Sequence, residues 1–456
     1  MGKRAMNNDA DQLILKVLAQ AFAGLGVSVS QAGLELVANC VYKALSISSR
    51  NFHTAEHVLS LVDPARPIQT LAALFHDLVY YQVDLGFCAE AYEVFSPYVK
   101  QIPGELFQVR QEIGGERVFG LALTIFDIQP GQVLSPSAGL NEFVSALVMS
   151  QKLGAYLPEK ELLKVMVYIE ASIPFRGMDT DHSGPCATLA GRLKNACEQY
   201  DVALPADEQV ETIQGAALFA NKDVENFAVS DPVAFLNHTW KLLPETNTAL
   251  RASGSYSIRE YRQALQHMLG FLCGLDPATI FRHYRGVPAE AELRQMQRFA
   301  SQNLEIGCQY LTVKLLSVAL LEALAVATGG DAPAASFLGY LRGEDAQGLR
   351  LEDFLPQVTP SPEADPSAPV FQLLSSASVD HLYFELSKSP FSLFVYKMLG
   401  MAGVRQYLEM AQGMFSGRLS AEAFLSRVDK EIVSAIARAC AALVLSRSEQ
   451  LDRFIT

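Results

Sequence analysis

Apolar residues recur along most of this chain at the three- and four-residue spacing that places them on one face of an α-helix. The first such face is formed by Leu13, Leu15, Val17, Leu18, Ala21 and Phe22. Similar helical stretches lie at about 31–46, 52–62, 67–81, 88–102, 140–153, 159–171, 185–199, 206–228, 257–274, 290–328, 371–387, 403–415, 420–428 and 430–447. Runs in which apolar and polar residues alternate, as they do in half-buried strands, are scarce. The pattern therefore predicts an all-α protein.

Two segments interrupt the helical pattern. Residues 103–138 carry glycine and proline at irregular positions, which predicts an irregular segment on the surface. Residues 356–369 hold five prolines in fourteen positions, which excludes a helix and predicts a linker. Residues 370–456 have a periodicity of their own, which indicates a C-terminal helical module. Its apolar residues could dock on the main body or on a second copy of the chain, so a homo-oligomer is one of two open alternatives.

The composition excludes several classes of protein. Half of the 456 residues are hydrophobic, so the chain can bury a large core and is not disordered. The 49 acidic residues outnumber the 36 basic ones, and the formal net charge is −13. This balance argues against a nucleic-acid partner, because contacts to phosphates need a basic face.

The cysteines and the apolar runs indicate a cytoplasmic protein. Seven cysteines, an odd number with no Cys-x-x-Cys spacing, predict reduced thiols rather than a disulfide framework or a zinc ribbon. Asp9 and Asp11 precede the first apolar stretch, so the N-terminus does not resemble a secretory signal. The most apolar run, Leu315 to Gly329, contains Glu322 and is too short to span a bilayer, so no membrane partner is expected.

Three short stretches contain candidate metal ligands. NFHTAEHV contains His53 and His57, which are four residues apart and project from the same face if the stretch is helical. A very apolar helix ends in the pair His76-Asp77, and ANKDVEN places Asp223 on another helix that is otherwise buried. Burying a lone carboxylate is costly, and a divalent ion bound by imidazole and carboxylate groups would offset that cost. The three stretches therefore predict a metal site.

The order of these residues resembles the H…HD…D signature of HD-superfamily metal-dependent phosphohydrolases. FHTAEHV is similar to the YHNxxHA stretch of class I cyclic-nucleotide phosphodiesterases, and KDVEN is similar to their later D-x-x-N element. FHDLVY resembles a string found in bacterial predicted HD phosphohydrolases. Thr54 stands where both branches have Asn. The resemblance covers residues 50–230 and implies an HD-domain-like helical core with additional C-terminal helices.

The resemblance also implies roles for the individual side chains. His57, His76, Asp77 and Asp223 would hold one or two divalent ions, with Asp77 placed to bridge two of them. Mn, Mg, Fe, Co and Zn are all compatible with this ligand set. A metal-bound hydroxide would attack the phosphorus of a nucleotide-like phosphomonoester or phosphodiester, and His53 would protonate the leaving oxygen.

Further residues are candidates for binding the small phosphorylated substrate. Asn226 could hold a substrate phosphate or orient a ligand, and Lys222 and Arg176 could neutralise the phosphate or be ordinary surface charges. The acids of residues 179–182 indicate a solvated turn rather than a second metal site. A basic, aromatic stretch indicates a solvated face, with an anionic ligand or an acidic partner helix as the alternative; it consists of Tyr256, Arg259, Tyr261, Arg262, Arg282, Tyr284 and Arg285.

We therefore expect an HD-type phosphohydrolase domain over residues 8–240, a helical extension over 241–355, the Pro-rich linker and the C-terminal module. The first functional hypothesis is a hydrolase. The alternative is a catalytically inert HD-fold sensor or scaffold, which the long additional helices and Thr54 motivate. A third hypothesis, an HD-type di-iron oxygenase, ranks below both because it needs further histidine ligands that the sequence does not offer.

Overall fold

The computed structural model describes residues 2–104, 106–111, 116–175, 184–251, 255–339, 349–376 and 390–456. Helices dominate these residues, and their strands are three short ones, which confirms the predicted all-α class. The chain folds into two compact units. The first comprises Met1–Ala228 and Asp276–Arg298, and the second comprises Val229–Leu275 and Phe299–Thr456. The predicted domain boundaries stay a prediction.

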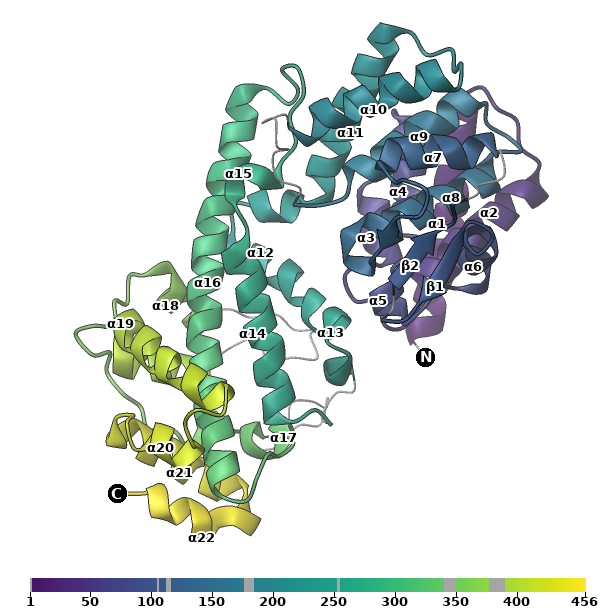
Figure 1. The fold of residues 1–456 in the computed structure, drawn as a ribbon. Helices are drawn as coiled ribbons and strands as arrows, with labels where there is room; N and C mark the ends of the chain where they lie inside the picture. The colour runs from purple at the N-terminus through teal and green to yellow at the C-terminus, as the bar shows by residue number, and fades with distance from the viewer. Residues whose placement is uncertain are drawn as a thin grey trace. The chain divides into compact units, whose positions relative to one another are not determined.

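The helices of the first unit come mainly from the N-terminal half of the chain (Figure 1). They are α1 (Gly2–Gly24), α2 (Gln31–Leu45), α3 (Ala55–Ser60), α4 (Pro67–Phe75), α5 (Tyr81–Asp84), α6 (Ala89–Phe95), α7 (Arg117–Phe126), α8 (Asn141–Leu153), α9 (Glu159–Ala171), α10 (Pro185–Gln199), α11 (Ala206–Asp223) and α15 (Pro277–Ile280). A π-helix, Pro136–Leu140, precedes α8, and a 3-10 turn, Glu225–Ala228, follows α11. Helix α9 packs against α4, α7, α8, α10 and α11 and forms the centre of the core.

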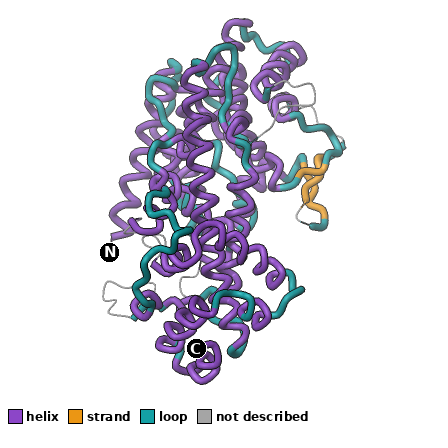
Figure 2. The backbone as a smooth tube through the Cα atoms, turned by 90° about the vertical axis from the view of Figure 1, so that its left-hand side faces the viewer, coloured by secondary structure: helices purple, strands orange, loops and turns teal. Residues whose placement is uncertain are grey.

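A small antiparallel sheet, orange in Figure 2, lies between α6 and α8 in the sequence. Strand β1 (Val99–Ile102) pairs with β2 (Leu106–Val109), which also pairs with β3 (Val133–Leu134). The predicted helix over 88–102 is therefore wrong beyond Phe95, where α6 ends. The prediction of an irregular surface segment at 103–138 is also wrong at α7, a helix with a buried face, and at β2 and β3. Short apolar runs between glycines and prolines do not show by periodicity alone which structure they form.

Helix α16 (Glu290–Ala327) matches the predicted helix at 290–328. Its residues up to Arg298 belong to the first unit, and the second unit is built around the rest of the helix. Its other helices are α12 (Pro232–Trp240), α13 (Leu242–Thr246), α14 (Ile258–Gly274), α17 (Ala334–Leu338), α18 (Pro369–Ser376), α19 (Pro390–Phe415), α20 (Ala421–Leu425), α21 (Lys430–Leu443) and α22 (Ser448–Leu451). Four 3-10 turns complete it, at Thr248–Arg251, Leu351–Phe354, Leu445–Arg447 and Asp452–Phe454. Among the described residues α16 is long and apolar enough to cross a membrane, and 89% of its most apolar window is buried inside the protein.

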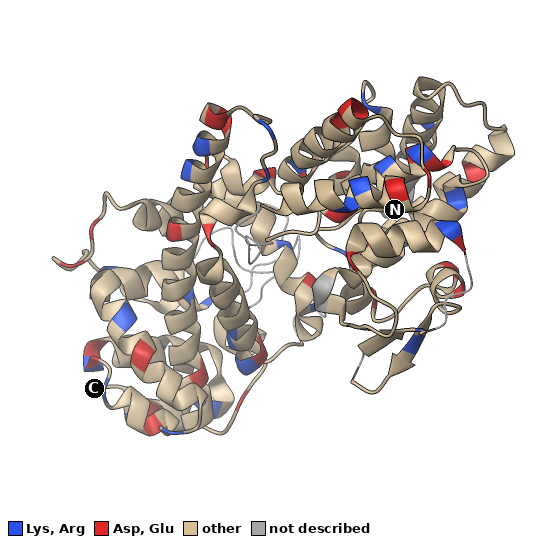
Figure 3. Ribbon diagram, turned by 45° about the horizontal axis from the view of Figure 1, so that its top comes forward, with Lys and Arg blue, Asp and Glu red and all other residues tan. Residues whose placement is uncertain are grey.

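A buried ion pair joins α14 to α16. The Nε atom of Arg262 lies 2.8 Å from a carboxylate oxygen of Glu322, and Arg259 reaches the same carboxylate at 3.1 Å. The guanidinium of Arg262 also lies over the ring of Phe415 in α19, 4.3 Å from its centroid. Tyr261, beside it, is buried as well, so the predicted solvated face is wrong at Tyr261 and Arg262. In the view of Figure 3, acidic and basic residues are interspersed over the helices.

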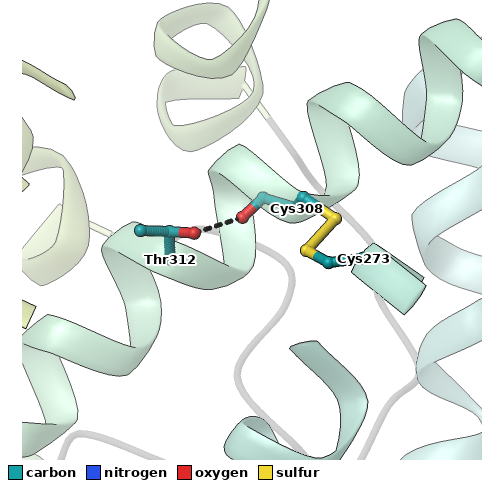
Figure 4. The surroundings of a disulfide bond; sticks show 3 residues. All are labelled: Cys273, Cys308 and Thr312. Atoms are coloured by element: carbon teal, nitrogen blue, oxygen red, sulfur yellow. Dashed lines mark hydrogen bonds between the residues drawn. A yellow bond between two sulfur atoms is a disulfide. The ribbon is translucent and has the colours of Figure 1, made fainter. Parts of the chain in front are cut away.

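One disulfide bond links α14 and α16 (Figure 4). It joins Cys273 to Cys308, 35 residues later in the chain, with the two Cα atoms 5.9 Å apart. The prediction that the cysteines are reduced is therefore wrong for this pair. The prediction fails because two long helices pack side by side and bring together two cysteines that are far apart in the sequence. Their spacing does not match any disulfide pattern that the sequence could reveal.

The Pro-rich segment leads into α18 and contains no helix before Pro369, as its composition predicts. It nevertheless packs on α19. The backbone N–H of Ser361 donates to the carbonyl oxygen of Lys397 at 2.8 Å, and Ala364 is buried. Helix α19 is interrupted at Gly400, where φ is 60° and a Cβ atom would meet the carbonyl group of Glu363. Only glycine adopts this backbone without strain and leaves room for that carbonyl.

Candidate metal centre

Three elements of the first unit supply the candidate ligands. His57 lies in α3, His76 and Asp77 directly follow α4, and Asp223 is the last residue of α11. The predicted helix over 52–62 begins only at Ala55, so His53 precedes it. Thr54 is the N-cap, and its side chain accepts from the backbone N–H of His57. Capping is a role that threonine and asparagine share, which accounts for Thr54 in physical terms.

Helix α4 fixes the position of the His-Asp pair. Pro67 stands at its first turn, where its missing N–H costs nothing, and every residue from Gln69 to Phe75 is buried. The backbone N–H of His76 still donates to the carbonyl oxygen of Ala72 at 2.8 Å, and then the helix ends. His76 and Asp77 therefore lie where a fully buried helix meets the site, and the His76 side chain is only 2% exposed.

The four predicted ligands lie close together. The Nε2 atom of His57 is 3.1 Å from Asp223 Oδ1 and 3.6 Å from Asp77 Oδ2. The Nε2 atom of His76 is 3.0 Å from Asp77 Oδ2 and 3.5 Å from Asp223 Oδ1. Donor atoms of His57, His76 and Asp223 all lie within 4.8 Å of one another, which is compatible with a shared ion. Asp77 lies beside this group.

Several of these atoms are buried without a hydrogen bond. His57 Nε2, His76 Nε2 and Asp77 Oδ2 have no hydrogen-bond partner among the described residues, although the distances between them are short. Buried polar atoms are normally paired, and an unpaired one costs about 1–3 kcal/mol. Three such atoms converging on one point fit a bound cation, since all three can donate a lone pair.

A backbone contact sets which His76 nitrogen faces the centre. Nδ1 of His76 lies 2.9 Å from the carbonyl oxygen of Ala73. A carbonyl can only accept, so Nδ1 carries the proton and donates it. The lone pair of the neutral ring is then on Nε2, which is the atom that faces Asp77 and Asp223. Metal-ligating histidines are commonly fixed in this way.

The charges of the centre favour a positive partner. Burial by itself lowers the pKa of His76, but the charges of Asp77 and Asp223 outweigh it and raise that pKa well above its usual range. Burial raises the pKa of Asp223, but the opposing charge of His76 and its contacts with both histidines bring it down to about 2. The same balance holds the pKa of Asp77 well below its usual range. Both carboxylates are therefore anionic at neutral pH.

A cleft of about 280 Å³ adjoins the centre, and His76, Asp77 and Asp223 contribute to its lining. His53 lines it too, with its ring centroid 5.8 Å from that of His57 and 4.6 Å from that of Tyr80. His53 therefore lies next to the candidate ligands. It does not belong to the group of His57, His76 and Asp223 whose donor atoms could share an ion.

Two amide side chains of the cleft were not predicted from the sequence. The backbone N–H of Tyr81 donates to Asn141 Oδ1 at 3.0 Å, which leaves Asn141 Nδ2 as the donor of a second bond, to Gln82 Oε1 at 3.0 Å. Because the oxygen of Gln82 accepts this bond, its NH₂ group is the part left to meet a ligand. In the sequence, Gln82 and Asn141 are two isolated polar residues, and nothing there indicates that they contact each other.

The predicted substrate-binding residues are distributed differently. Asn226 is buried in the turn after α11 and Lys222 is partly buried at the end of α11, and neither is among the described residues that line the cleft. Arg176 and the acids of residues 179–182 lie outside the described residues.

Comparison of this chain with models of protein families, with curated proteins and with solved structures finds no match.

Proposed function

We propose that this chain is a metal-dependent phosphohydrolase of the HD type, with its active site at the candidate metal centre. The observation that carries the proposal is the convergence of His57, His76, Asp77 and Asp223, with three buried atoms that have no hydrogen-bond partner among the described residues. Two imidazoles and two carboxylates form a ligand set for a borderline or hard divalent ion.

The protein's own residues prepare this site. Nδ1 of His76 donates to Ala73, so the ring presents Nε2 to the centre, where a bound ion would replace the proton that Nε2 carries in the charged ring. The cap at Thr54 fixes the start of the short helix that carries His57. An ion held there would lower the pKa of a water molecule and neutralise charge on the substrate's phosphorus-bound oxygens. One or two ions are compatible with the side chains, and the identity of the metal stays a prediction.

His53 is the residue we propose as the general acid. It lines the cleft beside the ligands, and histidine is the side chain that most often transfers protons in enzymes. Protonation of the leaving oxygen is needed when the leaving group is a poor one, such as an alkoxide. The contact between the rings of His53 and Tyr80 restricts the orientation of the imidazole.

The cleft supports a small phosphorylated substrate. Among the described residues that line it there is no lysine or arginine, so the ion would neutralise most of the phosphate charge. The NH₂ group of Gln82 offers donors to a phosphate or carbonyl oxygen. A nucleotide-like substrate remains the prediction made from the family resemblance.

Metal content and hydrolysis, measured together, test the proposal. Protein purified without added metal would be analysed for bound elements and assayed with phosphomonoesters and phosphodiesters in Mn²⁺, Mg²⁺, Fe²⁺, Co²⁺ and Zn²⁺. We expect bound metal and hydrolysis in the wild type and the loss of both in Asp77→Ala and Asp223→Ala. Asp63→Ala is the matched control, because Asp63 is a partly exposed carboxylate that pairs with Arg66 and is not among the residues that line the cleft.

Two results would count against the enzyme. Wild-type protein that takes up none of these ions would overturn the metal site. Protein that binds an ion but hydrolyses no phosphoester would favour the alternative, an inert HD-fold sensor or scaffold.

A further inference from the structure

After one last backbone bond, from the N–H of Leu78 to the carbonyl oxygen of Phe75, the chain that leaves α4 is held by side chains. Between Asp77 and Tyr81 the backbone is irregular. The N–H of Val79 donates to the hydroxyl of Ser145 at 3.0 Å, and the N–H of Tyr80 donates to a carboxylate oxygen of Asp84 at 3.3 Å. A helix end buried in this way needs such partners for its carbonyl groups as well.

Arg50 supplies those partners. Its Nη1 donates to the carbonyl oxygen of Asp77 at 2.6 Å and its Nη2 to that of Leu78 at 3.2 Å. The same guanidinium binds both carboxylate oxygens of Asp84, with Nε at 2.9 Å and Nη2 at 2.6 Å. The Arg50 side chain is 0% exposed and that of Asp84 only 9%. Four contacts therefore converge on one fully buried side chain.

Only an arginine can make this set of contacts. A guanidinium presents five N–H donors in a rigid planar fork, whereas a lysine ammonium is a point charge on a flexible stem. Its charge is compensated by Asp84, which makes burial tolerable. The two carbonyl oxygens and the carboxylate together hold the guanidinium in a single orientation.

The position of Arg50 links the two histidine-bearing segments. Arg50 precedes His53 by three residues and His57 by seven, and it binds the carbonyl of the residue whose carboxylate belongs to the metal centre. A shift of the Asp77 backbone would move Oδ2, which is 3.0 Å from His76 Nε2. Arg50 thus reaches the centre through the main chain of Asp77, without touching the ion or the substrate.

We infer that Arg50 is a positioning residue of the metal centre, which holds the Asp77 carboxylate at the distance from His57 and His76 that ion binding requires. This inference rests on the proposed metal site. It differs from a role in folding alone, because a structural ion pair would affect the stability of the protein but not its affinity for metal.

Arg262 provides the matched control. Counted over the whole residue, backbone included, Arg50 and Arg262 are each 5% exposed, and each forms a buried ion pair, Arg262 with Glu322. Arg262 belongs to the second unit, whereas the metal centre belongs to the first. Replacing either arginine by lysine removes comparable buried contacts and should lower stability in both cases. The two variants should therefore differ only in their affinity for metal.

The experiment measures Mn²⁺ affinity by calorimetry, the Co²⁺ absorption spectrum at saturation, and thermal unfolding of the metal-free protein. We expect Arg50→Lys to weaken Mn²⁺ binding by about 10–100-fold, the usual effect of losing a partner that orients a ligand, and to alter the Co²⁺ spectrum. Arg262→Lys should retain the wild-type affinity and spectrum. Both variants should unfold at a lower temperature than the wild type.

The outcomes separate the inference from the proposed function. Wild-type affinity and spectrum in folded Arg50→Lys would overturn the positioning role and leave the metal site intact. A wild type that binds neither Mn²⁺ nor Co²⁺ would overturn both. If Arg50→Lys does not fold, Asp84→Asn replaces it, since this variant keeps an acceptor for Arg50 but loses the charge. Asp84→Asn with wild-type Mn²⁺ affinity would overturn the inference.

Discussion

The imidazole of His76 is bound through Nδ1 to the carbonyl oxygen of Ala73, at 2.9 Å and three residues earlier in the same buried helix end. This contact gives the ring one orientation, with Nε2 facing the centre, before any ligand arrives. A side chain prepared in this way loses little freedom on binding an ion, which favours tight binding.

The first prediction concerns metal-induced stability. A ligand at about 100 times its Kd stabilises the fold by about 2.7 kcal/mol, which in a unit of this size corresponds to about 5–10 °C in Tm. We expect saturating Mn²⁺ to raise the Tm of the wild type by this amount and that of His76→Gln hardly at all. His267→Gln, at an exposed position in α14, is the control and should respond like the wild type. An equal shift in His76→Gln would contradict its role as a ligand.

The second prediction separates the proposed general acid, His53, from the proposed metal ligands. His53→Asn should lower kcat by about 10²–10⁴-fold for an alkyl phosphoester while leaving Mn²⁺ affinity unchanged. The loss should be much smaller for a p-nitrophenyl ester, because that leaving group needs little protonation. Equal losses for the two esters would show that His53 does something other than donate a proton to the leaving oxygen.

The third prediction concerns the metal-free protein as the pH changes. The pKa of His76 is raised well above its ordinary 6.5 by Asp77 and Asp223. Its ion pairing therefore stabilises the fold fully below about pH 6.5 and is lost as the pH rises through the higher, folded-state pKa. The pKa of Asp223 is lowered from 3.8 to about 2, so its contribution is present above pH 3.8 and is lost as the pH falls through about 2.

Thermal unfolding in EDTA from about pH 6 to about pH 10 checks the histidine part of this prediction. The Tm of the wild type should fall more steeply across this range than that of His76→Gln. Parallel profiles for the two proteins would show that His76 is not charged in the metal-free fold.

The fourth prediction concerns substrate binding at Gln82. Gln82→Ala should raise KM for a phosphoester by about 10-fold, the effect of losing one hydrogen bond to a charged group, with Mn²⁺ affinity unchanged. Asn141→Asp should have a similar effect, because a carboxylate in place of the Asn141 amide would attract the NH₂ group of Gln82 away from the substrate. An unchanged KM in both variants would remove Gln82 from the binding site.

The sequence predicts those parts of the molecule in which side-chain type and spacing carry the information. Strong apolar periodicity places α2, α8, α9, α10 and α16 within a residue or two of their observed bounds. His57, His76, Asp77 and Asp223 stand out because ionisable residues in apolar helices are rare.

The features that the sequence does not reveal depend on contacts between distant backbone and side-chain atoms. Arg50 acts on two carbonyl groups, and every residue has a carbonyl group, so nothing in its surroundings marks it. The orientation of Gln82 follows from the N–H of Tyr81 by way of Asn141. His53 lies outside α3 because Thr54 caps the helix. The apolar pattern of an eleven-residue stretch does not show at which residue a helix begins.

The interrupted helix at Gly400 has a practical consequence for engineering this chain. The Pro-rich residues have the composition of a flexible spacer, a place where tags, cleavage sites and fluorescent domains are usually inserted. Here the carbonyl of Glu363 occupies the space that a side chain at position 400 would need, and Ser361 is bonded to α19. An insertion within residues 361–364 would therefore disrupt the packing of this segment against α19. Leu445 is exposed and is a better position for a reporter.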